Sequence, residues 1–153
     1  MRGLPFALGL VVCTASPVRA QVSLLSVRDL SFGTVPLSVT TVVGPSDATR
    51  SGQFTLTGRP GMQVQVRLTL PNRLANASGA TIPIAFQSGD AFILETITGG
   101  APDYFNPGAT KVFKFTTGSQ AILRLGGRVT PGSTVPMGAY SNTVLATVTV
   151  LNL

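Results

Sequence analysis

The sequence has no histidine and no tryptophan, and it contains a single cysteine, Cys13, in 153 residues. Without histidine, no nucleophile–histidine pair can form, and zinc sites built on histidine and cysteine are excluded too. Charged residues make up only 10% of the chain, against about 25% in a typical soluble domain. These absences remove most catalytic and metal chemistry, and we expect no enzyme, no metal site and no cofactor.

The five acidic residues are too scattered to supply that chemistry instead. A calcium loop needs several acids within about a dozen residues, and a carboxylate-pair hydrolase needs two acids held together. Asp90 and Glu95 are the closest two in sequence. Asp90 follows Gly89 at a turn signal and Glu95 lies in an expected strand, so we interpret them as a turn aspartate and a solvated strand glutamate. Lys111 and Lys114 are interpreted as the polar face of a strand rather than as part of a serine–lysine dyad.

Residues 1–20 have the pattern of a secretory leader. Arg2 precedes a short apolar run, Leu4 to Val12, and a small residue, Ala20, ends the segment. The run has about half of the roughly 20 apolar residues that a membrane-spanning helix needs. We therefore predict cleavage before Gln21 and export to the periplasm, the cell surface or the extracellular space.

The remaining residues, 21–153, form one expected domain without a transmembrane segment. A lipoprotein would carry its lipid on Cys13, but the residue before it is Val12 instead of a small residue. After removal of the leader no cysteine remains, so no disulfide can form. Such a domain must be stabilised by its core or by assembly.

The chain is basic, with a formal net charge of +6. Its basic residues are spread along the sequence with no run of three, and most of its aromatic residues are phenylalanines on expected inner faces. We therefore expect no nucleic-acid partner. Two readings of the charge remain open: an ordinary solvated surface, or contact with a polyanionic surface such as lipopolysaccharide or matrix polysaccharide.

Glycine and proline, 17 and 11 residues, leave little room for helices, and the hydrophobic pattern repeats every two residues. In 62–70, Met62, Val64, Val66, Leu68 and Leu70 share one face, and polar residues share the other, as in a half-buried strand. The same reasoning predicts strands over 22–32, 35–43, 53–58, 62–70, 82–86, 91–97, 111–115, 121–129 and 139–153. Seven to nine short strands with no intervening helix predict an all-β, immunoglobulin-like antiparallel β-sandwich.

The last predicted strand is apolar on one face and mixed on the other. Val144, Ala146, Val148 and Val150 form the apolar face. Such a strand is either a buried central strand or a sheet edge available for pairing with another chain. Just before it, Tyr140 is either an ordinary aromatic at the sheet rim or a tyrosine-corner-like residue whose hydroxyl bonds a loop backbone.

Three segments together carry a family resemblance. They are Leu30-Ser31-Phe32-Gly33-Thr34-Val35; Gly52 to Gly58 followed by Pro60-Gly61 and the strand to Pro71; and Leu125-Gly126-Gly127 with Val129, then Met137 to Ser141 and the closing strand. The chain resembles a family of small exported bacterial β-sandwich proteins of unknown function. That family is related to spore-coat-protein-U-like subunits and to pilins of the archaic chaperone–usher type.

The resemblance implies a structural or adhesive surface subunit that associates by β-strand addition, with like subunits or a periplasmic chaperone as partners. In such pilins the sandwich lacks one strand, and a neighbour's N-terminal extension fills the groove. The residues expected to pair with a partner strand are Val22, Leu24, Val144, Val148 and Val150. Only 21–29 precede the first motif, so this segment is either a donor strand or the domain's own first strand. In the second case the protein is a self-complete binding module for a cell-surface or matrix ligand.

Overall fold

The computed structural model describes residues 22–96 and 100–152, and the predicted leader lies outside them. The described chain consists of strands, turns and extended loops, and contains no helix. No segment of this part forms a helix long and apolar enough to cross a membrane. The prediction of an all-β antiparallel sandwich is confirmed. The strands are β1 Ser23–Arg28, β2 Thr41–Val43, β3 Gly52–Thr57, β4 Gln63–Thr69, β5 Arg73–Ala75, β6 Thr81–Ala85, β7 Ala91–Glu95, β8 Asp103–Phe105, β9 Lys111–Lys114, β10 Gln120–Leu125, β11 Gly127–Val129 and β12 Leu145–Asn152.

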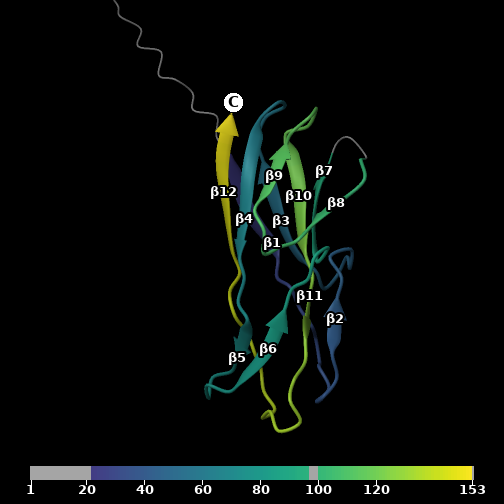
Figure 1. Cartoon of the computed structure of the whole chain (residues 1–153), viewed down its shortest axis with the longest axis vertical. Coiled ribbons are helices and arrows are strands. Elements are labelled where there is room, and N and C mark those ends of the chain that lie inside the picture. Colours follow the sequence, from purple (N-terminus) through teal and green to yellow (C-terminus); the bar gives the residue numbers. More distant parts are fainter. Residues whose placement is uncertain (1–21, 97–99, 153) are drawn as a thin grey trace, which may run out of the picture.

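The strands form three antiparallel sheets in an elongated molecule (Figure 1). A five-stranded sheet has the order β1-β3-β10-β7-β8, and a three-stranded sheet has the order β12-β4-β9. A four-stranded sheet, β2-β11-β6-β5, forms the other end of the molecule, away from the C-terminus. Consequently the first and last long strands, β1 and β12, are both edge strands.

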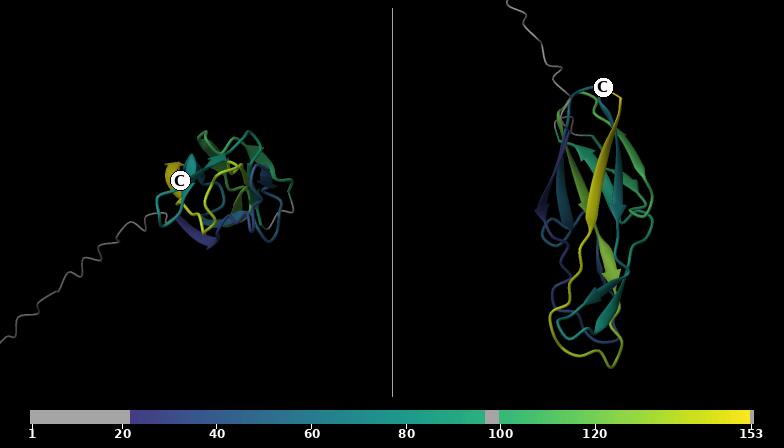
Figure 2. Two further views of the ribbon diagram at one scale, coloured as in Figure 1. Left: turned by 90° about the horizontal axis from the view of Figure 1, so that it is seen from below. Right: turned by 90° about the vertical axis from the view of Figure 1, so that its left-hand side faces the viewer.

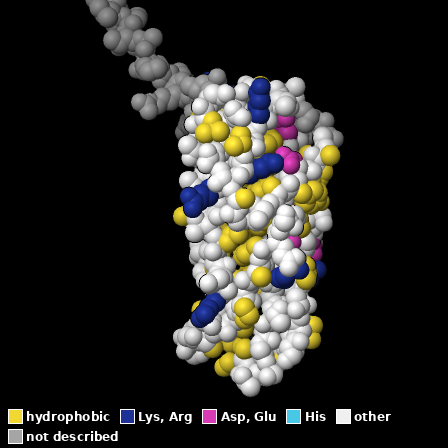
Figure 3. All heavy atoms as spheres, in the orientation of Figure 1, with side chains coloured by type: hydrophobic (Ala, Val, Ile, Leu, Met, Phe, Trp, Pro, Cys, Tyr) yellow, Lys and Arg dark blue, Asp and Glu magenta, His cyan; other side chains and the backbone are white. Residues whose placement is uncertain are grey.

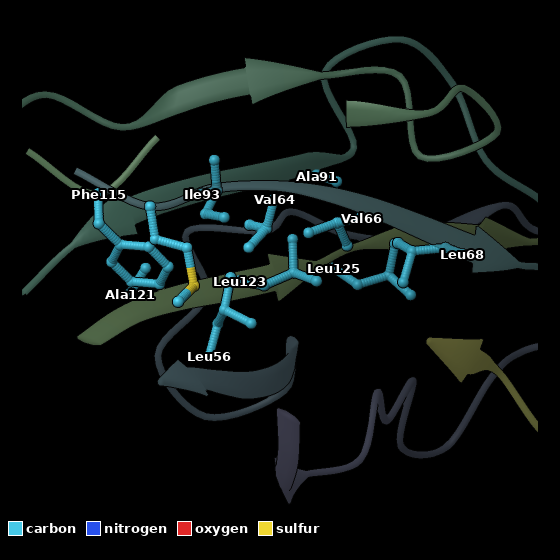
Figure 4. Packing of buried hydrophobic residues seen from close by; sticks show 11 residues of the cluster. Leu56, Val64, Val66, Leu68, Ala91, Ile93, Phe115, Ala121, Leu123 and Leu125 are labelled. Carbon is cyan, nitrogen blue, oxygen red and sulfur yellow. The ribbon is translucent and has the colours of Figure 1, made fainter. Parts of the chain in front are cut away.

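The core lies between the five-stranded and three-stranded sheets. Figure 4 shows Val64, Val66 and Leu68 of β4 facing side chains of β3, β7 and β10. Val64, Val66 and Leu68 are at most 5% exposed, whereas Arg67 and Thr69 of the same strand point to solvent. The period-two pattern therefore predicted the inner face of β4 correctly. Each fully buried aliphatic side chain of this kind contributes about 1.5–3 kcal/mol.

The expected strand 121–129 is two strands, because the chain changes sheet at Gly126. β10 belongs to the five-stranded sheet, and β11 pairs with β2 and β6. A Cβ atom at Gly126 would collide with the carbonyl oxygen of Val43 and with the backbone of Pro45. Glycine is therefore required at position 126, where the chain crosses close to the backbone of Val43 and Pro45.

The described residues form twelve strands, more than the expected seven to nine, because the pattern analysis did not detect the short ones. β5 and β8 have three residues each, too few to show an alternation. The expected strands 22–32, 35–43 and 139–153 are shorter, and they become β1, β2 and β12. Most of the expected strand residues 29–32, 35–40 and 139–144 are extended loop instead.

Candidate functional site

The last strand, β12, is the edge of its sheet. It pairs antiparallel with β4, with Val148 opposite Val66 and Val150 opposite Val64. Among the described residues, no strand pairs with the other side of β12. The structure thus decides between the two interpretations of this strand: it is an edge strand.

The first strand, β1, is the corresponding edge of the five-stranded sheet. It pairs antiparallel with β3, with Leu24 opposite Leu56. Cα atoms of β1 and β12 come within 8 Å of each other, yet the two strands form no hydrogen-bonded ladder. Figure 2 (right) shows β12 along this side of the molecule with β1 (purple) beside it. Backbone pairing therefore does not close the sandwich on this side.

All five residues predicted for partner-strand pairing lie along these two edges. Val22 and Leu24 belong to the β1 side, and Val144, Val148 and Val150 to the β12 side. Each packs against the core while remaining partly exposed. The structure therefore places residues at least 120 positions apart along two neighbouring edges of the sandwich.

An apolar groove of about 1220 Å³ continues from this side toward the far end of the molecule. Its walls are the extended segments 29–37 and 135–144, and its floor includes Phe54, Leu125 and Ile84. Small-molecule sites usually measure about 300–1,000 Å³, so the groove has room for an extended segment. The sequence analysis missed it because 29–32, 35–37 and 139–144 were expected to be parts of strands, although Pro36 was a signal against that in the first wall.

A small number of hydrogen bonds anchor the wall segments. The Ser31 N–H donates to the Arg50 carbonyl (2.8 Å), and the Ser38 N–H donates to that of Pro131 (3.0 Å). The Tyr140 hydroxyl donates to the Pro136 carbonyl at 2.6 Å and accepts from the Asn76 amide at 3.3 Å. Tyr140 therefore makes the loop-backbone bond of a tyrosine-corner-like residue, within a loop rather than at a strand.

The lower end of β1 is held by an arginine. Arg28 donates from Nε to the Ser51 carbonyl at 2.8 Å and from Nη2 to the Ser51 hydroxyl at 3.1 Å. Ser51 is fully buried, and it ends a turn in which Asp47 accepts bonds from Thr49 and Arg50. These bonds, the backbone amide of Thr49 first, hold the pKa of Asp47 well below its ordinary value. The edge strand β1 is thus attached firmly to its own domain.

The interpretation of Glu95 as a solvated strand residue was wrong. Glu95 is 7% exposed, and its carboxylate accepts bonds from the hydroxyl and N–H of Thr116 and from the N–H groups of Thr117 and Gly118. These bonds, the Thr116 hydroxyl first, lower the pKa of Glu95 despite its burial. Burial is favourable here because a neighbouring turn supplies the donors that water would have supplied.

Asp90 is a turn aspartate, as expected, since its N–H donates to the Gln87 carbonyl at 3.0 Å, and it is also buried. It accepts a bond from the Gln87 N–H at 2.7 Å and lies 3.4 Å from Nη2 of Arg128. Asp90 precedes β7 and Glu95 ends it, so about 16 Å of strand separates them. They do not form a carboxylate pair. Among the described residues, no group of three or more acids, histidines or cysteines could hold a metal ion.

Lys111 is not on the polar face of β9. It alternates with Val112 and so shares a face with Phe113, where its ammonium lies 2.5 Å from the Asp103 carboxylate and 5.7 Å from the Phe105 ring centre. The ion pair and the aromatic ring replace the solvent that the lysine loses. Lys114 points to solvent, as expected.

Comparisons with known proteins do not extend these observations: no family model matches the chain, and a search of curated proteins found no significant match. The pilin-like resemblance therefore depends on the sequence motifs alone.

Proposed function

We propose that the chain is an exported structural or adhesive subunit of a pilus-like or coat-like surface assembly, and that it associates with its partners by β-strand addition. The observation that carries this proposal is the free edge of β12, flanked by half-buried apolar side chains and continuous with an apolar groove. The partners are like subunits or a periplasmic chaperone.

The physical basis is the unpaired backbone of β12. Every second N–H and C=O of an edge strand points away from its single neighbour, and a further strand can pair with those groups. The inner side chains Val144, Val148 and Val150 are incompletely covered. An added strand would cover them with its own alternating apolar side chains, so pairing and burial would favour the same register.

The position of β1 limits how a like subunit could supply that strand. Ser23–Arg28 is paired with β3 and attached through Arg28. A second copy donating this segment would first have to release it from its own sheet. A partner strand from elsewhere, such as an edge strand of a chaperone, carries no such cost.

The attachment of β1 also favours a second candidate, a self-complete binding module. In that case β1 and β12 close the sandwich, and the groove of about 1220 Å³ takes a cell-surface or matrix ligand. The two candidates differ in whether the free edge of β12 becomes paired.

Hydrogen exchange over 145–152 tests this difference. The protein, expressed from its full-length gene, is compared as an isolated monomer and in its assembled or partner-bound form. We expect protection at alternate amides in the monomer and at consecutive amides in the assembly. A concentration-independent monomer with one cooperative unfolding transition and no gain of protection would exclude strand addition and favour the binding module.

A further inference from the structure

The outer face of the three-stranded sheet carries cations and no acids. Arg67 on β4 and Lys114 on β9 both point to solvent from this face. Arg59 precedes β4 and Arg73 follows it, and both are exposed. Strands β4, β5, β9 and β12 contain no aspartate or glutamate. The cations therefore follow the length of β4 without a local counter-charge.

The acidic residues are occupied elsewhere. Asp47, Asp90 and Asp103 form ion pairs with Arg50, Arg128 and Lys111, respectively. Glu95 is buried among the amides of the 116–118 turn. Asp29 follows β1, in the other sheet. Within the described part of the chain, Arg67, Lys114, Arg59 and Arg73 take part in no ion pair. Arg28 and Arg124, on the five-stranded sheet, are also outside these ion pairs, so four of the six described cations without an ion pair lie on or next to β4 and β9.

The two cations on the strands themselves, Arg67 and Lys114, are widely spaced. Lys114 lies opposite Gln63, and Arg67 is four residues further along β4, a separation of about 13 Å along the strand. Between them the face presents Gln65 and Thr149, which are opposite each other. In Figure 3, dark-blue side chains are spread over the visible surface from one end to the other. Between its two charges the face thus presents amide and hydroxyl groups together with the exposed apolar side chain of Val112, which lies opposite Gln65.

We propose that this face binds an acidic polysaccharide, with Arg67 and Lys114 at its centre. Duplex DNA carries one charge per about 1.7 Å, a far smaller spacing than that between Arg67 and Lys114. The carboxylates of a polymer with one acidic group per sugar or disaccharide are more widely spaced and match the separation of these cations better. Amide and hydroxyl side chains between the charges supply hydrogen bonds to sugar hydroxyls. The site is separate from the β12 edge and does not depend on strand addition.

Binding to polygalacturonate-coated beads, with neutral dextran beads as the reference, tests the proposal. The double variant R67Q/K114Q is compared with R50Q/R124Q, which removes the same charge from other faces. We expect salt-sensitive retention of the wild type and a roughly three- to tenfold rise in Kd for R67Q/K114Q, the size expected from losing two exposed ion pairs. The control variant should change Kd less than about twofold.

Several outcomes would overturn the proposal. An equal weakening of both variants would attribute binding to net charge alone, and no retention at low salt would exclude the site. Tighter binding to duplex DNA or to anionic lipid vesicles, abolished by R67Q/K114Q, would assign the face to a different polyanion. Unfolding curves of both variants confirm that they are folded.

Discussion

A lysine on the inner face of β12 should block strand addition while leaving the fold intact. Val148 is half-buried beside the open edge and lies opposite Val66. In the isolated subunit a lysine at this position can direct its ammonium out through the open side. Val148→Lys then costs about half of a valine's burial, roughly 1 kcal/mol, and lowers Tm by about 3–5 °C.

An added strand would close that exit. The ammonium would be enclosed between the strand and the core, at a cost of several kcal/mol for an unpaired buried ion. Because about 1.4 kcal/mol corresponds to a tenfold change in affinity, association should weaken at least about a hundredfold. Inward-pointing charges protect natural sheet edges in the same way.

Analytical ultracentrifugation of the protein expressed from its full-length gene measures this association. The matched control is Thr149→Lys, because Thr149 is the neighbouring residue, points outward from the sheet and lies opposite the uncharged Gln65. Assembly should survive in the control and be lost in Val148→Lys. The reasoning is refuted if Val148→Lys assembles normally with an unchanged Tm, or if both variants lose assembly equally.

Two further predictions concern the stability of the sandwich. Glu95→Gln should lower Tm at pH 7, because the folded state holds the Glu95 pKa below its ordinary value of 4.5. That contribution is present above the ordinary pKa and is lost as the pH falls through the lowered one, so thermal scans should show the difference from wild type shrinking in acid; a constant difference would contradict this. Gly126→Ala should cost more than about 3 kcal/mol in urea unfolding, because its methyl group meets rigid backbone of Val43 and Pro45. Gly108→Ala, whose methyl group meets only a side-chain oxygen at 3.4 Å, should cost less than about 1 kcal/mol, and equal costs would disprove the crossing argument.

The period-two pattern was a reliable guide wherever one face of a strand is buried. The boundaries of 53–58, 62–70, 82–86 and 111–115 agree with β3, β4, β6 and β9 to within one residue. Loops that run extended beside the sandwich have the same local composition as strands. The pattern therefore could not distinguish 29–32, 35–40 or 139–144 from paired strands, although Pro36 weakened the prediction for 35–40.

The apolar residues of the β1 and β12 edges were identifiable from the sequence, whereas their arrangement and the groove beside them were not. Val144, Val148 and Val150 were identifiable as an apolar face of one strand. Whether that strand was central or at an edge depended on the sheet order β12-β4-β9, which involves pairings between distant segments. The burial of Glu95 depended likewise on a turn 21–23 residues away that donates to its carboxylate.

The sequence by itself determined that this protein is an all-β sandwich, since alternating apolar residues and frequent glycine and proline are local properties of the chain. It also determined the excess of basic over acidic residues and the absence of histidine. Only the tertiary structure decided that β1 and β12 are neighbouring edges, that 29–37 and 135–144 enclose a groove, and that Arg67 and Lys114 share a face without acids. Those features arise from contacts between residues far apart in the chain, which no local pattern encodes.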